Sequence, residues 1–123
     1  GLAWPARVES GTARLDFRTL GALTFEVPDA GRFPGLQLAW QTLRAPPGTT
    51  AVLNAANEVA ALAFLDRRLG FLNIAAVVAE TLERATKAGM AFGSGDACGA
   101  ALSVDAETRR MAESVIAGLA NAA

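Results

Sequence analysis

The 123-residue sequence contains no histidine, one cysteine and one lysine. Without histidine, the chain has no imidazole for acid–base chemistry near neutral pH, for metal ligation or for a Ser-His or Cys-His nucleophile pair. The single cysteine, Cys98, excludes an internal disulfide and fits a reducing cytosol. No basic residue flanks it, so nothing predicts a reactive thiolate there. Any chemistry would rest on carboxylates, arginines or Lys87.

The sequence also lacks an excess of basic charge and a long apolar run. Lysine and arginine total 11 against 12 aspartates and glutamates, which gives a formal net charge of −1 and excludes a surface built to follow nucleic-acid phosphates. No apolar run approaches the roughly 18 residues needed to cross a membrane, and the N-terminal residues do not resemble a signal peptide. We therefore expect a cytoplasmic protein without nucleic-acid or membrane partners.

Hydrophobic residues, in contrast, make up 52% of the chain, enough for the core of one domain. Residues 49–70 give the strongest helical signal, and this segment is apolar on most sides, as is typical of a helix at the centre of its domain. We expect Thr49 or Thr50 to cap its N-terminus and Gly70 to end it in the left-handed conformation. The apolar positions that repeat with the helical period are Leu53, Ala56, Ala60, Ala63 and Phe64 on one face, and Val52, Val59 and Leu62 on another.

Asn54, Asn57 and Glu58 interrupt this apolar helix, and their spacing places them on one side of it. One interpretation is a ligand site with a carboxylate and two amides, or a carboxylate-based enzyme that uses Glu58. We favour a buried structural polar network, because buried amides nearly always have protein partners. The residues alone therefore predict no catalytic, cofactor-binding or metal-binding position.

A shorter helix is expected over residues 32–44, where Pro34 is tolerated in the first turn. A proline-rich turn at residues 45–48 separates it from the central helix. Its larger apolar side chains share one stripe, which we expect to pack in the core. The members of this stripe are Phe33, Leu36, Trp40 and Leu43.

Two more amphipathic helices complete a predicted antiparallel four-helix bundle. The third is expected from Asn73, as its N-cap, to Ala88, with the pairs Glu80–Arg84 and Glu83–Lys87 on its solvent face. A glycine-rich connector over residues 89–101 lacks the features of a phosphate-binding loop. The fourth helix is expected to begin at Ser103 or Asp105. The apolar positions predicted to face the core are Ile74, Val77, Val78, Leu82 and Ala85 in the third helix, and Val104, Thr108, Met111, Ala112, Val115, Ile116 and Leu119 in the fourth.

Residues 1–29 do not have a helical pattern and are expected to form an extended arm, whereas residues 30–123 form the bundle domain. Residues 23–27 alternate apolar and polar side chains, which is typical of a half-buried strand. Because one or two strands are marginal by themselves, this strand would need a sheet supplied from elsewhere. Trp4, beside Pro5, is a candidate anchor for a partner surface.

Short motifs along the whole chain follow the order found in one enzyme family. They are Ala3-Trp4-Pro5, Arg7-Val8, Ser10-Gly11, Leu15-Asp16-Phe17, Leu23-Thr24-Phe25, Pro28-Asp29, Arg32-Phe33-Pro34, the string LNAANE at residues 53–58, Ala63-Phe64-Leu65 and residues 102–106. The string LNAANE is specific at this position. With these motifs the chain resembles the C-terminal portion of the 1-deoxy-D-xylulose 5-phosphate reductoisomerases.

This resemblance implies a larger parent enzyme, which converts 1-deoxy-D-xylulose 5-phosphate to 2-C-methyl-D-erythritol 4-phosphate in non-mevalonate isoprenoid biosynthesis. The family uses NADPH and a divalent cation, Mg²⁺ or Mn²⁺, and forms homodimers. Its dinucleotide fingerprint, acidic metal ligands and phosphate contacts belong to upstream motifs that no position here matches. The resemblance therefore implies a structural C-terminal fragment, inactive alone, whose partners are the N-terminal and catalytic domains of the parent.

Two further expectations follow from the arm. Alone, residues 23–27 are expected to be disordered or to pair with a second copy, because unpaired strand edges associate. The alternative function is a free-standing helical bundle that binds another protein through the arm.

Overall fold

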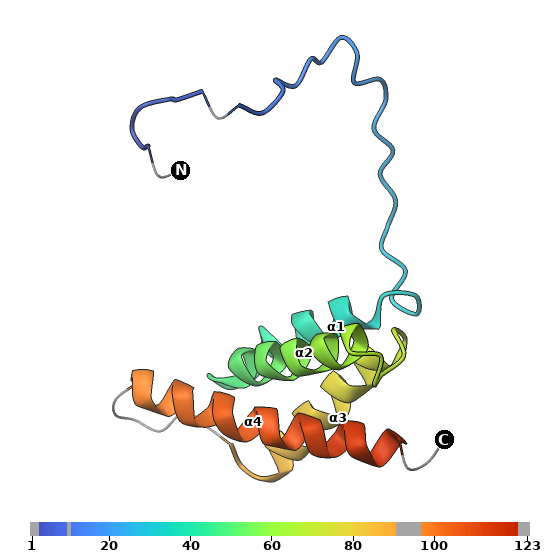
Figure 1. Ribbon diagram of the computed structural model, residues 1–123, viewed down its shortest axis with the longest axis vertical. Helices are drawn as coiled ribbons and strands as arrows, with labels where there is room; N and C mark the ends of the chain where they lie inside the picture. The colour runs from blue at the N-terminus through green and yellow to red at the C-terminus, as the bar shows by residue number, and fades with distance from the viewer. Residues whose placement is uncertain (1–2, 10, 91–96, 121–123) are drawn as a thin grey trace.

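The computed structural model describes residues 3–9, 11–90 and 97–120, which form an extended arm and four helices (Figure 1). The helices are α1 (Pro34–Thr42), α2 (Thr49–Leu65), α3 (Asn73–Lys87) and α4 (Ala97–Ala120). No described residue belongs to a strand, so the predicted all-α fold class is confirmed. No helix in the described ranges combines the length and the apolar character needed to span a bilayer.

Helix α2 contacts each of the other three helices, whereas α1 contacts only α2 and α3. The main core lies where α2, α3 and α4 meet, and alanines on α2 and α4 let the helices approach closely. The larger side chains predicted to face inward from α2, Leu62 and Phe64, are exposed instead. The buried members of this core are Ala56, Val59, Ala60, Ala63, Leu69, Val77, Val78, Ala112, Val115 and Ile116.

The N-terminus of α2 differs from its prediction, because no threonine side chain caps it. Gly48 is the N-cap residue and has a left-handed backbone with φ of 96°. The Thr49 hydroxyl donates a hydrogen bond to the carbonyl oxygen of Pro46 at 2.8 Å. The tight turn before the helix thus gives this hydroxyl a nearer partner than the free amides of the first turn.

The predicted end of α2 at Gly70 is also wrong, because the helix ends at Leu65. Arg67 takes the left-handed position, with φ of 59°. The amide of Arg68 donates to the carbonyl of Ala63 at 2.8 Å, and that of Arg67 donates to Phe64 at 2.9 Å. This hydrogen-bond pattern is a Schellman motif built on a residue that is not glycine.

Helices α3 and α4 also begin differently from their predictions. Asn73 is the first residue of α3 rather than its cap, and Leu72 at the cap position makes no side-chain bond. Helix α4 begins at Ala97, so Ser103 and Asp105 lie inside it and residues 97–101 are not loop. The alanines in its first turns favour a helix strongly enough to override the glycine there. Residues 91–96 of the predicted connector lie outside the described residues.

The apolar stripes of α3 and α4 match their predictions except at Leu119, which is exposed near the end of α4. Val77, Val78 and Ala85 of α3 are buried, and Ile74 and Leu82 pack against the cores. In α4, the inward positions are Val104, Thr108, Ala112, Val115 and Ile116, whereas Met111 is half-buried and Leu119 is exposed. The predicted pairs on α3 form, with Arg84 to Glu80 at 2.7 Å and Lys87 to Glu83 at 2.6 Å.

The predicted core stripe of α1 faces outward, which corrects the sequence-based expectation. Trp40 is 54% exposed and Leu43 is 66% exposed. The helix instead turns Leu38 and Thr42 inward, and Leu38 packs against the main core while Thr42 is buried. Smaller side chains on this face allow α1 to lie closer to α2 and α3 than a tryptophan would permit.

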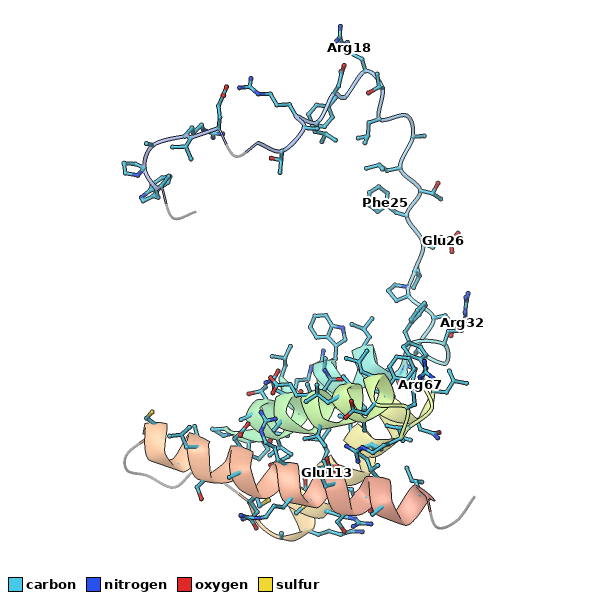
Figure 2. The ribbon with its side chains drawn as sticks, viewed as in Figure 1. Arg18, Phe25, Glu26, Arg32, Arg67 and Glu113 are labelled. Carbon is cyan, nitrogen blue, oxygen red and sulfur yellow. The ribbon has the colours of Figure 1, made fainter. Side chains whose placement is uncertain are left out.

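The arm leaves the bundle beside α1 and extends far from the helices (Figure 2). Its apolar side chains are exposed, including Phe25 and Val27 within the predicted strand. Residues 23–27 have no paired strand among the described residues.

Candidate functional site

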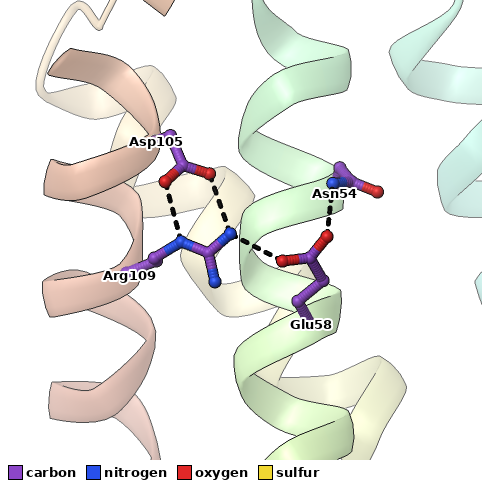
Figure 3. A network of polar contacts seen from close by, with 4 residues as sticks. All are labelled: Asn54, Glu58, Asp105 and Arg109. Carbon is purple, nitrogen blue, oxygen red and sulfur yellow. Dashed lines mark hydrogen bonds and ion pairs between the residues drawn. The ribbon is translucent and has the colours of Figure 1, made fainter. Parts of the chain in front are cut away.

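A polar cluster joins α2 to α4 on the surface of the bundle (Figure 3). The amide nitrogen Nδ2 of Asn54 donates to Oε1 of Glu58 at 3.0 Å, across one turn of α2. The Nη2 of Arg109, on α4, donates to Oε2 of Glu58 at 2.6 Å. Arg109 also holds Asp105 through two bonds, from Nε at 2.7 Å and from Nη2 at 3.0 Å.

The electrostatics of this cluster keep both carboxylates charged. Hydrogen bonds from Arg109 and Asn54 lower the pKa of Glu58 from its ordinary value. The hydrogen bond from Arg109 lowers the pKa of Asp105, and the two carboxylates, Asp105 first, raise the pKa of the guanidinium. A carboxylate with a lowered pKa remains an acceptor near neutral pH, so neither group is suited to deliver a proton.

The network expected around Asn54, Asn57 and Glu58 differs from this cluster in position and in membership. All three side chains are exposed rather than buried, because this side of α2 faces away from the core. Asn57 makes no side-chain hydrogen bond with any described residue, whereas Arg109 and Asp105 belong to the cluster. The spacing of Asp105 and Arg109 indicated a pair on α4, but no sequence signal placed that pair beside Glu58.

A second ion pair lies further along the same contact. Arg68, just after α2, donates to both carboxylate oxygens of Glu113 at 3.0 and 3.2 Å. Glu113 follows Arg109 by one turn of α4, so the two residues share a face of that helix. Two arginine–carboxylate contacts therefore tie α4 to α2 and to the turn that follows it.

An apolar groove with a volume of about 470 Å³ opens between α1, α2 and the start of α3. Asn57 and Arg32 supply its polar side chains, and neither can act as a nucleophile or as a general base near neutral pH. The groove can therefore hold an apolar side chain but offers no means of catalysis. The lining residues are Arg32, Phe33, Pro34, Gly35, Leu36, Leu38, Leu53, Asn57, Phe71, Leu72, Ile74, Ala75 and Val78.

Neither the polar cluster nor the apolar groove fits a metal ion or a dinucleotide. Within the described ranges, no three histidine, cysteine or acidic side chains are grouped so that they could hold a metal ion. The nearest approach to such a group is Glu58 with Asp105, and Arg109 occupies both of these carboxylates. Trp4 lies on the arm with its ring exposed, and Cys98 is exposed in the first turn of α4.

Comparison with known proteins gives one consistent result. The family model for the DXP reductoisomerase C-terminal domain matches residues 1–111. The 1-deoxy-D-xylulose 5-phosphate reductoisomerase of Caulobacter vibrioides is 48% identical over 116 residues, which is 94% of this chain and 29% of that protein. The enzyme of the same name from Ralstonia nicotianae is 50% identical over 117 residues, 95% of this chain and 28% of its own length. The chain thus spans less than a third of these relatives.

Solved structures agree. The Zymomonas mobilis reductoisomerase in complex with NADPH is 38% identical with a TM-score of 0.77, over 94% of this chain and 29% of that one. A DOX-P reductoisomerase crystallised with fosmidomycin and magnesium is 35% identical with a TM-score of 0.85, over 98% of this chain and 31% of that one. With this fold, these motifs and these matches, the chain belongs to the family of DXP reductoisomerase C-terminal domains.

Proposed function

We propose that this chain serves as the structural C-terminal domain of a reductoisomerase that converts 1-deoxy-D-xylulose 5-phosphate to 2-C-methyl-D-erythritol 4-phosphate. In this proposal residues 1–29 are the linker arm and residues 30–123 the bundle domain. The observation that carries it is the family match over residues 1–111, in a chain that spans 29% of a relative with this activity. The match favours this role over a free-standing interaction module.

NADPH and the divalent cation of the parent reaction are proposed to bind outside this chain. The carboxylates of Glu58 and Asp105 are engaged by Arg109, and the groove beside α1 carries no phosphate-binding set of side chains. We therefore assign no catalytic, cofactor-binding or metal-binding residue here. The chain alone is expected to be inactive.

The polar cluster has a structural role in this proposal. The bond between Arg109 and Glu58 fixes the position of α4 along α2, and the bond between Asn54 and Glu58 orients the carboxylate toward Arg109. Asn57, the third member predicted from the sequence, contributes instead to the wall of the groove.

The proposed partners are the N-terminal and catalytic domains of the parent, which acts as a homodimer in the cytoplasm. The arm supports this part of the proposal, because Leu15, Phe17, Leu23, Phe25 and Val27 are all exposed. Separated from those domains, the arm is expected to associate with a second copy through its unpaired backbone.

A chimeric enzyme tests this proposal. The 116 matching residues of the Caulobacter vibrioides enzyme are replaced by this chain, and oxidation of NADPH is followed with the sugar phosphate and Mg²⁺. We expect activity from the chimera and none from this chain alone. The same enzyme without its matching residues is the control. An inactive but folded chimera, or an active isolated chain, would contradict the proposal.

A further inference from the structure

The outward stripe of α1 is an apolar feature that the described bundle does not bury. We define the α1 stripe as Phe33, Leu36, Trp40 and Leu43, all of which are exposed. An amphipathic helix normally buries its larger apolar side chains. Here α1 turns Leu38 and the polar Thr42 inward, so the four side chains of the stripe remain available to another surface.

The α1 stripe is continuous with the end of the arm. A shallow apolar hollow of about 220 Å³ is shared by the two segments, with Pro28 and Ala30 from the arm and Phe33, Leu36 and Trp40 from the stripe among its lining residues. The end of the arm nearest the bundle therefore lies beside the α1 stripe, and a body attached through the arm is tethered to this end of the bundle. Such a tether raises the effective concentration of the attached body at this face.

The charged side chains within residues 30–57 are arginines, and the Asp29 carboxylate at the end of the arm accepts from the backbone amides of Gly31 and Arg32. No aspartate or glutamate occurs between Asp29 and Glu58. Arg32 and Arg44 lie at the two ends of the stripe, with guanidinium carbons 5.7 Å from the Phe33 ring and 5.8 Å from the Trp40 ring. Complementarity requires a partner surface that is apolar in the middle and carries carboxylates at both ends.

We propose that the α1 stripe docks the bundle onto the preceding part of its own parent polypeptide, through an apolar surface rimmed by carboxylates. This inference rests on the proposed function. Relatives such as the Caulobacter vibrioides enzyme devote 29% of their length to the part matched here, so the tethered body is much larger than the bundle. Aromatic and arginine side chains are the residues enriched at the energetic centres of such interfaces.

Hydroxyl-radical footprinting with mass spectrometry tests the docking, because it measures the exposure of individual side chains. The oxidation rate of Trp40 is compared between this chain alone and the Caulobacter chimera. We expect at least a fivefold lower rate in the chimera, with no change at Leu102, which is 67% exposed on α4. Equal rates for Trp40 in an active chimera would overturn the inference and leave the proposed function intact.

Matched variants separate docking from folding. Leu43 and Leu102 are exposed at 66% and 67%, so Leu43→Gln and Leu102→Gln change equally exposed side chains. In the chimera, Leu43→Gln is expected to restore at least half of the Trp40 oxidation rate, and Leu102→Gln to have no effect. Circular dichroism of this chain should show unchanged helix content for both variants. Equal effects of the two variants on Trp40 would overturn the inference.

The charges at the ends of the stripe are tested in the same way. Arg44→Glu should raise Trp40 oxidation in the chimera at least threefold, whereas Arg110→Glu, on an exposed position of α4, should not. Protection of Trp40 in the isolated chain that increases with concentration would identify a second copy as the occupant and overturn the inference. An inactive chimera would contradict the proposed function and therefore also the docking inference that rests on it.

Discussion

Arg109 is the side chain at which the contacts between α2 and α4 converge. It binds Glu58 on the neighbouring helix and Asp105 on its own, and both bonds are 2.6–2.7 Å at their shortest. A guanidinium presents several donors in a fixed plane, so one arginine can hold two carboxylates at once. The same geometry explains why neither acid is available for proton transfer near neutral pH.

This cluster predicts a specific loss of stability in acid. Because the folded pKa values of Glu58 and Asp105 are lowered, their contribution is complete above the unfolded values near about pH 4 and is lost as the pH falls through the folded values. Arg109→Met removes the largest cause of both shifts. We expect its melting temperature to fall less steeply than that of the parent chain below about pH 5.

Thermal unfolding by circular dichroism from pH 7 to pH 2 measures this difference. Arg110→Met is the control, since Arg110 is exposed and neighbours Arg109 on the same helix. If the melting temperatures of the parent chain and Arg109→Met fall equally steeply with pH across this range, the cluster does not contribute to the acid dependence of stability.

A buried hydroxyl on α4 predicts a substitution that raises, rather than lowers, the stability of the bundle. Thr108 is fully buried, and its Oγ1 has no hydrogen-bond partner among the described residues. Thr81 is equally buried on α3, but its Oγ1 donates to the carbonyl of Val77 at 2.7 Å. Valine has the shape of threonine, so Thr108→Val should stabilise the bundle by about 1–2 kcal/mol and Thr81→Val should destabilise it by about 0.5–1 kcal/mol.

Urea unfolding of the two valine variants checks this pair. The test depends on the sign of each change in stability, because both substitutions replace a buried hydroxyl with a methyl group and differ only in whether that hydroxyl has a partner. Destabilisation by Thr108→Val would mean that its hydroxyl has a partner in solution.

At the scale of the element, α2 and α3 end in the same way but with different residues. Arg67 and Gly89 both have a left-handed backbone, with φ of 59° and 65°, and each is followed by an amide that bonds back into the last turn of its helix. Only glycine adopts this conformation without steric cost. The end of α2 is thus strained in a way that the end of α3 is not.

Exchanging the residue type at these two ends should have opposite effects. Arg67→Gly is expected to stabilise the chain by about 0.5–1 kcal/mol, because relief of the left-handed penalty outweighs the added unfolded-state entropy, which opposes folding. Gly89→Ala should destabilise it by about 1 kcal/mol, and the reason is conformational because no atom lies within 4 Å of the added Cβ. Chemical denaturation midpoints measure both. A loss of stability in Arg67→Gly would show that the arginine side chain itself stabilises this turn.

At the scale of the whole molecule, the chain consists of a packed bundle and an arm without packing of its own. In the arm, Arg14 and Arg18 are exposed and pair only with nearby residues of the arm, whereas Arg68 and Arg109 form ion pairs that join parts of the bundle far apart in the sequence. Proteolysis follows exposure and local opening. Trypsin should therefore cut this chain after Arg14 or Arg18 before it cuts α3 or α4.

Mass spectrometry of the early fragments identifies the first cuts. In the Caulobacter chimera the same two sites should be cut at least tenfold more slowly, because there the arm is expected to lie against the rest of the enzyme. First cleavage within α4, at Arg109 or Arg110, would contradict this description of the molecule.

Much of the helical organisation could be predicted from the sequence, because it depends on local spacing. The stripes of α3 and α4, the two ion pairs of α3, the proline in the first turn of α1 and the all-α class all follow from residues within a few turns of one another. The family also follows from the linear order of motifs. Helix ends were predicted less well, because glycine and asparagine signals compete with backbone bonds in the turns.

The sequence by itself determined which residues share a helical face and which family the chain belongs to. Only the tertiary structure decided which face of α1 turns inward and that Glu58 meets Arg109, 51 positions away. The physical reason is that periodicity orders side chains around one helix axis, whereas the choice of neighbour depends on the close packing of all the helices together. Leu38 and Thr42 take the inward positions of α1, which packs on α2 and α3, and Trp40 is left outside the core.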